Sequence, residues 1–369
     1  MSKAAELAKM GEVLTNSQIG GRRNLILNPK MQVAQRGTST AGITTSGFYT
    51  VDRFEVTIVS AGTYTMAQST TVPSGQGFSH SVKMDCTTAD ASLTGTDQVR
   101  LSTYLEGQDL QQLKYGTSEA ESLTLQFWVK SNKTGTYIVW FIQPDDDRQN
   151  AASYTINSAD TWEKKTITIS GDTTGVIDND NGRGLEVSFI LGAGSDYTSG
   201  TAPSNWEARV NANRYAGQTV NLSDSTDNEW LMTGFQMEVG SQATPFEHRS
   251  LGEEILLCQR YYQEMGSFPI VIIGSNNFQG TVAPKVVMRS APTVSTDSNQ
   301  GRVTDCNVAD FTTGGLNPAV TANAYEKGNF GWISARFQGS GLDGGTSGDP
   351  GVYLPTGTNG NPLQMDAEL

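Results

Sequence analysis

Residues 123–131 read LTLQFWVKS, and this stretch decides the fold class. Apolar side chains at every second position alternate with polar or amphipathic ones, which is the period of a β-strand with one buried face. Residues 132–135, NKTG, have the composition of a turn, and 137–142, YIVWFI, form a second apolar run. We expect the two runs to pair as a β-hairpin. The predicted buried residues are Leu123, Leu125, Phe127 and Val129.

Short segments of this kind recur along the chain between turn-rich stretches. Many short strands separated by turns indicate a sandwich or jelly roll. The predicted fold is mainly β: a jelly-roll β-sandwich with a short N-terminal helix, a connecting helix and a smaller C-terminal β domain. Further strands are expected at 54–59, 64–68, 79–85, 166–170, 185–191 and 231–239 in the sandwich, and at 270–273, 280–288, 293–296 and 330–337 beyond it.

Two segments with helical spacing flank the sandwich. The first segment, 1–23, is interpreted as a short helix and an attachment or trimerisation segment. A helix this short needs a partner for its apolar stripe, which could be its own sandwich, symmetry copies of the chain or the particle to which it docks. The second, 250–265, is predicted to connect the sandwich at 24–249 to the C-terminal β domain at 266–369. The residues expected in these oligomer or junction contacts are Leu7, Met10, Leu14, Leu256, Cys258, Tyr261 and Tyr262.

The composition excludes several classes of function. The formal charge of −13 opposes binding to a phosphate backbone, so we expect no nucleic-acid partner. Three cysteines with no close pair argue against a disulfide framework, and no apolar run reaches the roughly 18 residues of a membrane span. Only His80 and His248 occur, and neither has metal-ligand spacing or a Gly-x-Ser-x-Gly neighbour. We therefore expect no catalytic residues and no enzymatic activity.

Two groups of residues are candidates for binding. Trp128 lies on the polar side of the 123–131 strand with Gln126 and Lys130, and an aromatic ring between polar groups suits the apolar face of a sugar. These three are the candidate glycan contacts, although each tryptophan is more often a core residue. Asp178 and Asp180 in the run DNDNG are candidate calcium ligands, with an ordinary polar turn as the alternative. No other cofactor is expected.

Several motifs resemble phage tail proteins. The segments 24–31 (NLILNPKM), 35–37 (QRG) and 49–54 (YTVDRF) resemble the opening of β-sandwich modules in tail-fibre and minor tail proteins. Trp162-Glu163-Lys164-Lys165 resembles the strand entry of carbohydrate-binding-module jelly rolls. The segments 235–240, 245–249 and 254–262, with LCQRYY at 257–262, are similar to the junction that closes such a module. Related modules hold a structural calcium ion near adjacent acidic residues, whereas this chain has Gln236-Met237-Glu238.

The resemblance implies a virion protein with a lectin-like fold. We expect a homotrimeric tail-fibre-like subunit, assembled in the host cytoplasm, that attaches to other virion proteins through its N-terminal segment and binds host surface polysaccharide. A head-decorating or tail structural subunit without a receptor role is one alternative. A capsule depolymerase is the other, for which two carboxylates would have to be correctly placed.

Overall fold

The computed structural model describes Lys3 and residues 22–274, 277–295, 301–305, 321–323, 333–338, 350–355 and 363–369. Residues 4–21, which include Leu7, Met10 and Leu14, lie outside this part of the chain. The chain divides into two compact units, Met1–Glu254 with Leu369, and Ile255–Glu368.

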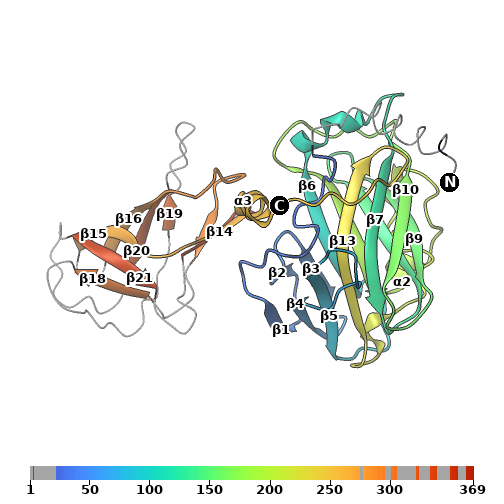
Figure 1. Ribbon diagram of the computed structural model, residues 1–369, viewed down its shortest axis with the longest axis horizontal. Helices are drawn as coiled ribbons and strands as arrows, with labels where there is room; N and C mark the ends of the chain where they lie inside the picture. Colours follow the sequence, from blue (N-terminus) through green and yellow to red (C-terminus); the bar gives the residue numbers. More distant parts are fainter. Residues whose placement is uncertain are drawn as a thin grey trace. The chain divides into compact units, whose positions relative to one another are not determined.

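The larger unit is a sandwich of two antiparallel sheets (Figure 1). Strands with one apolar face can bury it only against another layer, and the two sheets supply each other's cover. The mainly β jelly-roll fold predicted from the sequence is confirmed. The six-stranded sheet has the order β1 (Ser39–Ile43), β4 (Thr63–Ser69), β5 (Ser81–Thr88), β13 (Glu229–Val239), β7 (Leu123–Ser131) and β10 (Glu163–Ile169). The seven-stranded sheet has the order β12 (Glu207–Ala208), β9 (Arg148–Ile156), β8 (Gly135–Gln143), β11 (Arg183–Ala193), β6 (Gln98–Glu106), β3 (Glu55–Val59) and β2 (Gly47–Phe48).

The core lies between these sheets and is centred on aromatic rings. Phe127 of β7 is fully buried, and its ring makes edge contacts with Tyr154 at 5.1 Å and Phe189 at 5.0 Å. Trp230 is also fully buried and donates from Nε1 to the Tyr154 hydroxyl at 3.2 Å. The inward residues predicted for β7 all belong to this core. Short helical turns join the strands: η1 (Gly107–Asp109), η2 (Gln111–Leu113), α2 (Ser195–Thr198), η3 (Asn211–Asn213) and η4 (Leu222–Asp224).

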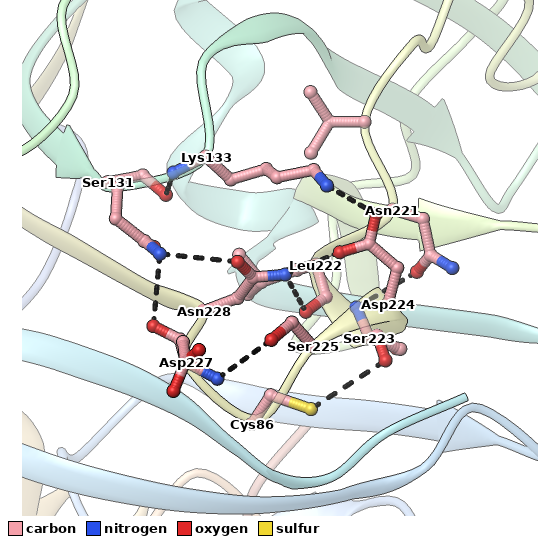
Figure 2. Close-up of polar contacts among 12 residues, drawn as sticks. Cys86, Ser131, Lys133, Asn221, Leu222, Ser223, Asp224, Ser225, Asp227 and Asn228 are labelled. Atoms are coloured by element: carbon pink, nitrogen blue, oxygen red, sulfur yellow. Dashed lines mark hydrogen bonds and ion pairs between the residues drawn. The ribbon is translucent and has the colours of Figure 1, made fainter. Parts of the chain in front are cut away.

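The predicted hairpin of β7 with β8 is wrong, because the two strands belong to opposite sheets. The turn between them crosses the end of the sandwich, and its polar groups bond to the 222–229 segment instead of to a hairpin ladder. Asn132 donates from Nδ2 to the Asp227 carbonyl at 3.0 Å, and its Oδ1 accepts from Glu229 N at 2.9 Å. Figure 2 shows this end of the sandwich, where Lys133 also pairs with Asp224.

Two segments distant in sequence are joined by charged side chains, and we call residues 23–31 and 244–254 the clasp. Glu247 Oε2 accepts from the backbone N–H groups of Arg23 and Asn24, at 2.8 and 2.7 Å. Arg249 donates from Nη2 to the carbonyls of Asn24 and Ile26, at 2.9 and 2.8 Å. The clasp therefore fixes both ends of the sandwich sequence beside β13, where Leu25 N donates to Met237 O at 2.9 Å.

The connecting helix is shorter than predicted. Helix α3 covers Leu251–Gln259, and Tyr262–Met265 form strand β14, so a helix through residue 265 is wrong. Tyr262 pairs with Asp366 in strand β22, and this long-range pairing prevails over the helical spacing of the segment. Leu256 is 54% exposed, whereas Cys258, Tyr261 and Tyr262 are buried. The predicted apolar stripe is thus divided between a helix, a turn and a strand.

The smaller unit contains two further sheets. One has the order β14 (Tyr262–Met265), β22 (Leu363–Asp366) and β17 (Thr293–Ser295). The other has the order β18 (Gly301–Asp305), β21 (Pro350–Pro355), β15 (Phe268–Gly274), β16 (Asn277–Val282), β20 (Ile333–Gln338) and β19 (Thr321–Asn323). A small C-terminal β unit is therefore present, as predicted.

Candidate functional site

The three residues predicted from the sequence to contact a glycan are on the outward side of strand β7, in the six-stranded sheet. Trp128 and Lys130 are half-buried on β7 and reach this surface. Gln126 does not reach it: the residue is 1% exposed, and its Nε2 donates to the Thr244 carbonyl at 2.5 Å. Strand alternation places the three on one side of β7, but the clasp covers the end of the strand that holds Gln126. Their role in glycan binding stays a prediction.

Several hydrogen bonds hold this cover in place. Glu238 on β13 accepts from Thr244 N at 2.7 Å and from the Thr244 hydroxyl at 2.6 Å. Gln236 Oε1 accepts from Glu247 N at 2.7 Å. Gln236 and Glu238, the two outward residues of the motif 236–238 (QME), therefore both bond to the clasp, whereas Met237 between them belongs to the core. This gives a structural reason for a polar residue at each of these outward positions.

Trp128 lies in a patch of charged and polar side chains. It is opposite Lys164 of β10 on one side and Thr233 of β13 on the other. Among the residues that the structure describes, Trp128 has no ring partner and no side-chain hydrogen bond. The exposed part of the Trp128 ring is therefore a surface available to a ligand.

A carboxylate on β13, Glu229, pairs with Lys130 of this patch and with Lys83 of β5. Lys83 Nζ lies 2.6 Å from Glu229 Oε2, and Lys130 Nζ lies 3.8 Å from Glu229 Oε1. Burial alone would lower the pKa of Lys83, but its hydrogen bonds with Glu229 and Asp85 outweigh burial and raise it. Leu231 lies between the two lysines in register and is only 1% exposed. Lys130, two residues along the same face of β7, and Lys164, opposite Trp128 on β10, thus place cations next to an aromatic ring.

The calcium candidates form part of an ordinary turn. Asp180 Oδ1 accepts from Gly182 N at 2.8 Å, and Asp178 N donates to Asp145 Oδ2 at 3.0 Å. Burial raises the pKa of Asp145, and the negative charges of Asp178, Asp180 and Asp146 raise it further. Within the described ranges no group of three His, Cys, Asp or Glu residues could hold a metal ion. Asp178 and Asp180 are therefore not brought together with a third ligand of these types.

A second chemically rich region, on the outer face of the seven-stranded sheet, was not identified from the sequence. Arg100 of β6 pairs with Glu186 of β11 and donates to the Ser188 hydroxyl at 2.9 Å. Ser188 in turn donates to Glu186 at 2.7 Å and lies 2.7 Å from the Ser102 hydroxyl. Tyr104 donates to Glu55 on the neighbouring strand β3. Charged and hydroxyl groups on β6 and β11 thus form one connected network, and the Tyr104–Glu55 pair lies next to it, with Tyr104 opposite Glu186 in register.

An aromatic cluster adjoins this network. Trp140 of β8 lies opposite Ser188, and the segment that follows β12 places Arg214 over its ring. The Arg214 Cζ atom lies 4.2 Å from the Trp140 ring centroid, 4.7 Å from that of Tyr197 and 5.1 Å from that of Tyr215. Part of this region could have been found: residues 98–104, QVRLSTY, alternate clearly. Arg214 could not, because the segment around it has no periodicity.

The thiol and hydroxyl groups at the end of the sandwich shown in Figure 2 are bonded to the fold. The Ser223 hydroxyl donates to Ala61 O at 2.8 Å and lies 2.6 Å from the Tyr64 hydroxyl. Burial raises the pKa of the Cys86 thiol, so this group is not a thiolate near neutral pH. Neither group is therefore an activated nucleophile.

The two sheets define the larger unit as a jelly-roll β-sandwich, and comparison with solved structures gives a distant likeness in fold. The enzymatically active domain of bacteriophage CBA120 tailspike protein 4 is 12% identical, with a TM-score of 0.30; the match covers 58% of this chain and 21% of that chain. A putative sugar-binding protein from Bacteroides thetaiotaomicron is 12% identical, with a TM-score of 0.34, over 59% of this chain and 100% of that one. A family 11 carbohydrate-binding module from Clostridium thermocellum is 12% identical, with a TM-score of 0.25, over 62% and 100%.

No family model and no curated protein matches the chain. Within the described residues no helix is long and apolar enough to cross a membrane.

Proposed function

We propose that this chain is a non-enzymatic, tail-fibre-like subunit of a bacteriophage virion that binds host surface glycans through the patch around Trp128. The observation that carries glycan binding is the half-buried Trp128 ring, which lacks a ring or hydrogen-bond partner among the described residues and is flanked by charged groups. A sugar ring presents an apolar CH face that suits an indole and hydroxyls that suit lysine and carboxylate groups.

The virion role is supported by the sequence resemblance at 24–31 and 257–262. The first of these segments belongs to the clasp, so it lies beside the strand that borders β7. Assembly in the host cytoplasm and a homotrimeric state are part of the same proposal. Strand β10 is an edge of the six-stranded sheet, and open sheet edges favour pairing with another chain.

A glycan array of bacterial surface polysaccharides tests the binding role. We expect specific binding by the full chain and a loss of roughly tenfold or more in affinity for Trp128→Ala, as for a central aromatic contact. Trp128→Phe should retain part of the binding because it keeps a flat ring. Val210→Ala is the matched control, since Val210 is an exposed apolar residue, 45% exposed, outside this patch.

Three outcomes would contradict parts of this proposal. Equal glycan binding by the Trp128→Ala variant and the unchanged chain would mean that the patch around Trp128 is not the glycan site. Release of reducing ends from a bound polysaccharide would identify a depolymerase instead. A monomer mass by light scattering at micromolar concentration would contradict the trimer.

A further inference from the structure

Arg214 is a buried cation without a counter-ion in the described part of the chain. The residue is 8% exposed, and its Nε atom is covered and has no hydrogen-bond partner. No ion pair of its guanidinium occurs among the described residues. Its contacts are with the rings of Trp140, Tyr197 and Tyr215. Arginines buried to this extent are usually paired with a carboxylate.

The carboxylates near this arginine are already engaged. Glu186 pairs with Arg100 and accepts from Ser188. Glu207, seven residues before Arg214, accepts from the side-chain amides of Gln149 at 2.9 Å and Asn213 at 3.0 Å. Burial and the positive charge of Arg100 lower the pKa of Arg214, and together they outweigh the interactions with Tyr215, Tyr197 and Glu186, which raise it. The position therefore holds a positive charge whose neutralisation within the described fold is incomplete.

The surrounding rings make the position suitable for a ligand. Three aromatic faces restrict the guanidinium and attract its charge, so little rotamer freedom remains to be lost on binding. Because Nε is covered, a ligand would meet the two terminal nitrogens, which have the fork geometry that matches an anionic oxygen group. The chain as a whole carries −13, so this local positive charge is not a general property of its surface.

We propose that Arg214 anchors a binding site for an anionic oxygen group of an acidic saccharide, either a sugar carboxylate or a sugar phosphate. The site is on the outer face of the seven-stranded sheet, so it goes beyond the Trp128 patch and does not depend on it. Arg100, which keeps Glu186 occupied, is a positioning residue for this site. The buried rings of Trp140 and Tyr215 hold the guanidinium in place from below.

The test is a titration at constant ionic strength with three compounds: sodium glucuronate as a sugar carboxylate, glucose 6-phosphate as a sugar phosphate, and glucose as the uncharged sugar. Binding is measured by calorimetry and by the shift in the melting temperature of the full chain. We expect at least one of the two anions to bind and glucose to have no effect, and the anion that binds identifies a carboxylate or a phosphate site. Arg214→Gln should weaken that binding roughly tenfold or more, because one charge-assisted contact is lost. Arg214→Lys should give an intermediate affinity, since it keeps the charge without the fork.

Arg209→Gln is the matched control, because Arg209 belongs to the same segment but is 40% exposed and paired with Asp147. Its binding should equal that of the unchanged chain. The inference is overturned if neither anion binds the unchanged chain, or if the Arg214→Gln and Arg214→Lys variants bind as well as the control. Should Arg214→Gln fail to fold, the lysine variant alone decides between these results. None of these outcomes bears on glycan binding by Trp128, which its own variant tests.

Discussion

Replacing Arg249 by methionine would test whether the clasp stabilises the sandwich. The Arg249 side chain is 3% exposed, and its Nη1 lies 3.0 Å from Oε1 of Glu254, which is 1% exposed. Removing one member of a buried ion pair costs about 3–5 kcal/mol. Glu254 would keep the hydrogen bond from Asn28 N at 2.7 Å and the nearby charge of Lys30, but would lose its buried partner. The change also leaves the carbonyls of Asn24 and Ile26 without their donor. We expect Arg249→Met to lower the free energy of unfolding by about 4 kcal/mol, which corresponds to roughly 10 °C in melting temperature.

Urea unfolding followed by tryptophan fluorescence measures this change. Five of the six tryptophans lie between residues 128 and 230, so the signal reports mainly on the sandwich. Arg209→Met is the control: its ion pair with Asp147 is exposed and should contribute less than about 1 kcal/mol. The Arg249→Met/Glu254→Gln double variant should lose less stability than the sum of the single losses, because it leaves neither charge unpaired. A loss below about 1 kcal/mol for Arg249→Met, or strict additivity in this cycle, would refute the reasoning.

Three further predictions concern other parts of the sandwich. Burial alone would raise the pKa of Glu163, but hydrogen bonds from Lys165 and from the 157–158 turn outweigh it and lower the pKa to about 2. The Glu163 contribution to stability is therefore present above its ordinary pKa of 4.5 and is lost as the pH falls from there through about 2. Glu163→Gln should reduce the change of melting temperature with pH over this range, and an unchanged slope would contradict the prediction. Gly234→Ala should lower the free energy of unfolding by at least about 1 kcal/mol, because its φ is +62° and the new Cβ would lie 2.5 Å from the ring of Phe78. Gly252→Ala in α3 is the control: its Cβ would meet nothing within 4 Å, so the change should be neutral or stabilising. Phe127→Ala should cost about 4 kcal/mol in the same urea assay, and a loss below about 2 would mean that the aromatic centre repacks around the cavity.

The local pattern of the sequence determined the strands and their buried faces. Alternation in 123–131 identified the residues of β7 that enter the core, because the side-chain period of a strand is a local property. The sheet to which each strand belongs is not a local property. A turn such as Asn132–Gly135 has the same composition in a hairpin as in a crossing between sheets. The choice depended on the 222–229 segment, which supplies the turn's hydrogen bonds from about 95 residues away.

The tertiary structure alone decided which outward residues are accessible. Gln126 and Trp128 are equivalent in the strand pattern, yet the clasp buries the first and leaves the second half-exposed. Helix α3 ends where Tyr262 finds a partner strand about 100 residues later, which helical spacing cannot reveal. The rings around Arg214 are those of Trp140 on β8, Tyr197 in α2 and the neighbouring Tyr215, so only folding brings the three together. Alternation along a strand shows which side chains face the core. Which outward side chains are covered depends on irregular segments elsewhere in the chain, whose sequences have no helical or strand period.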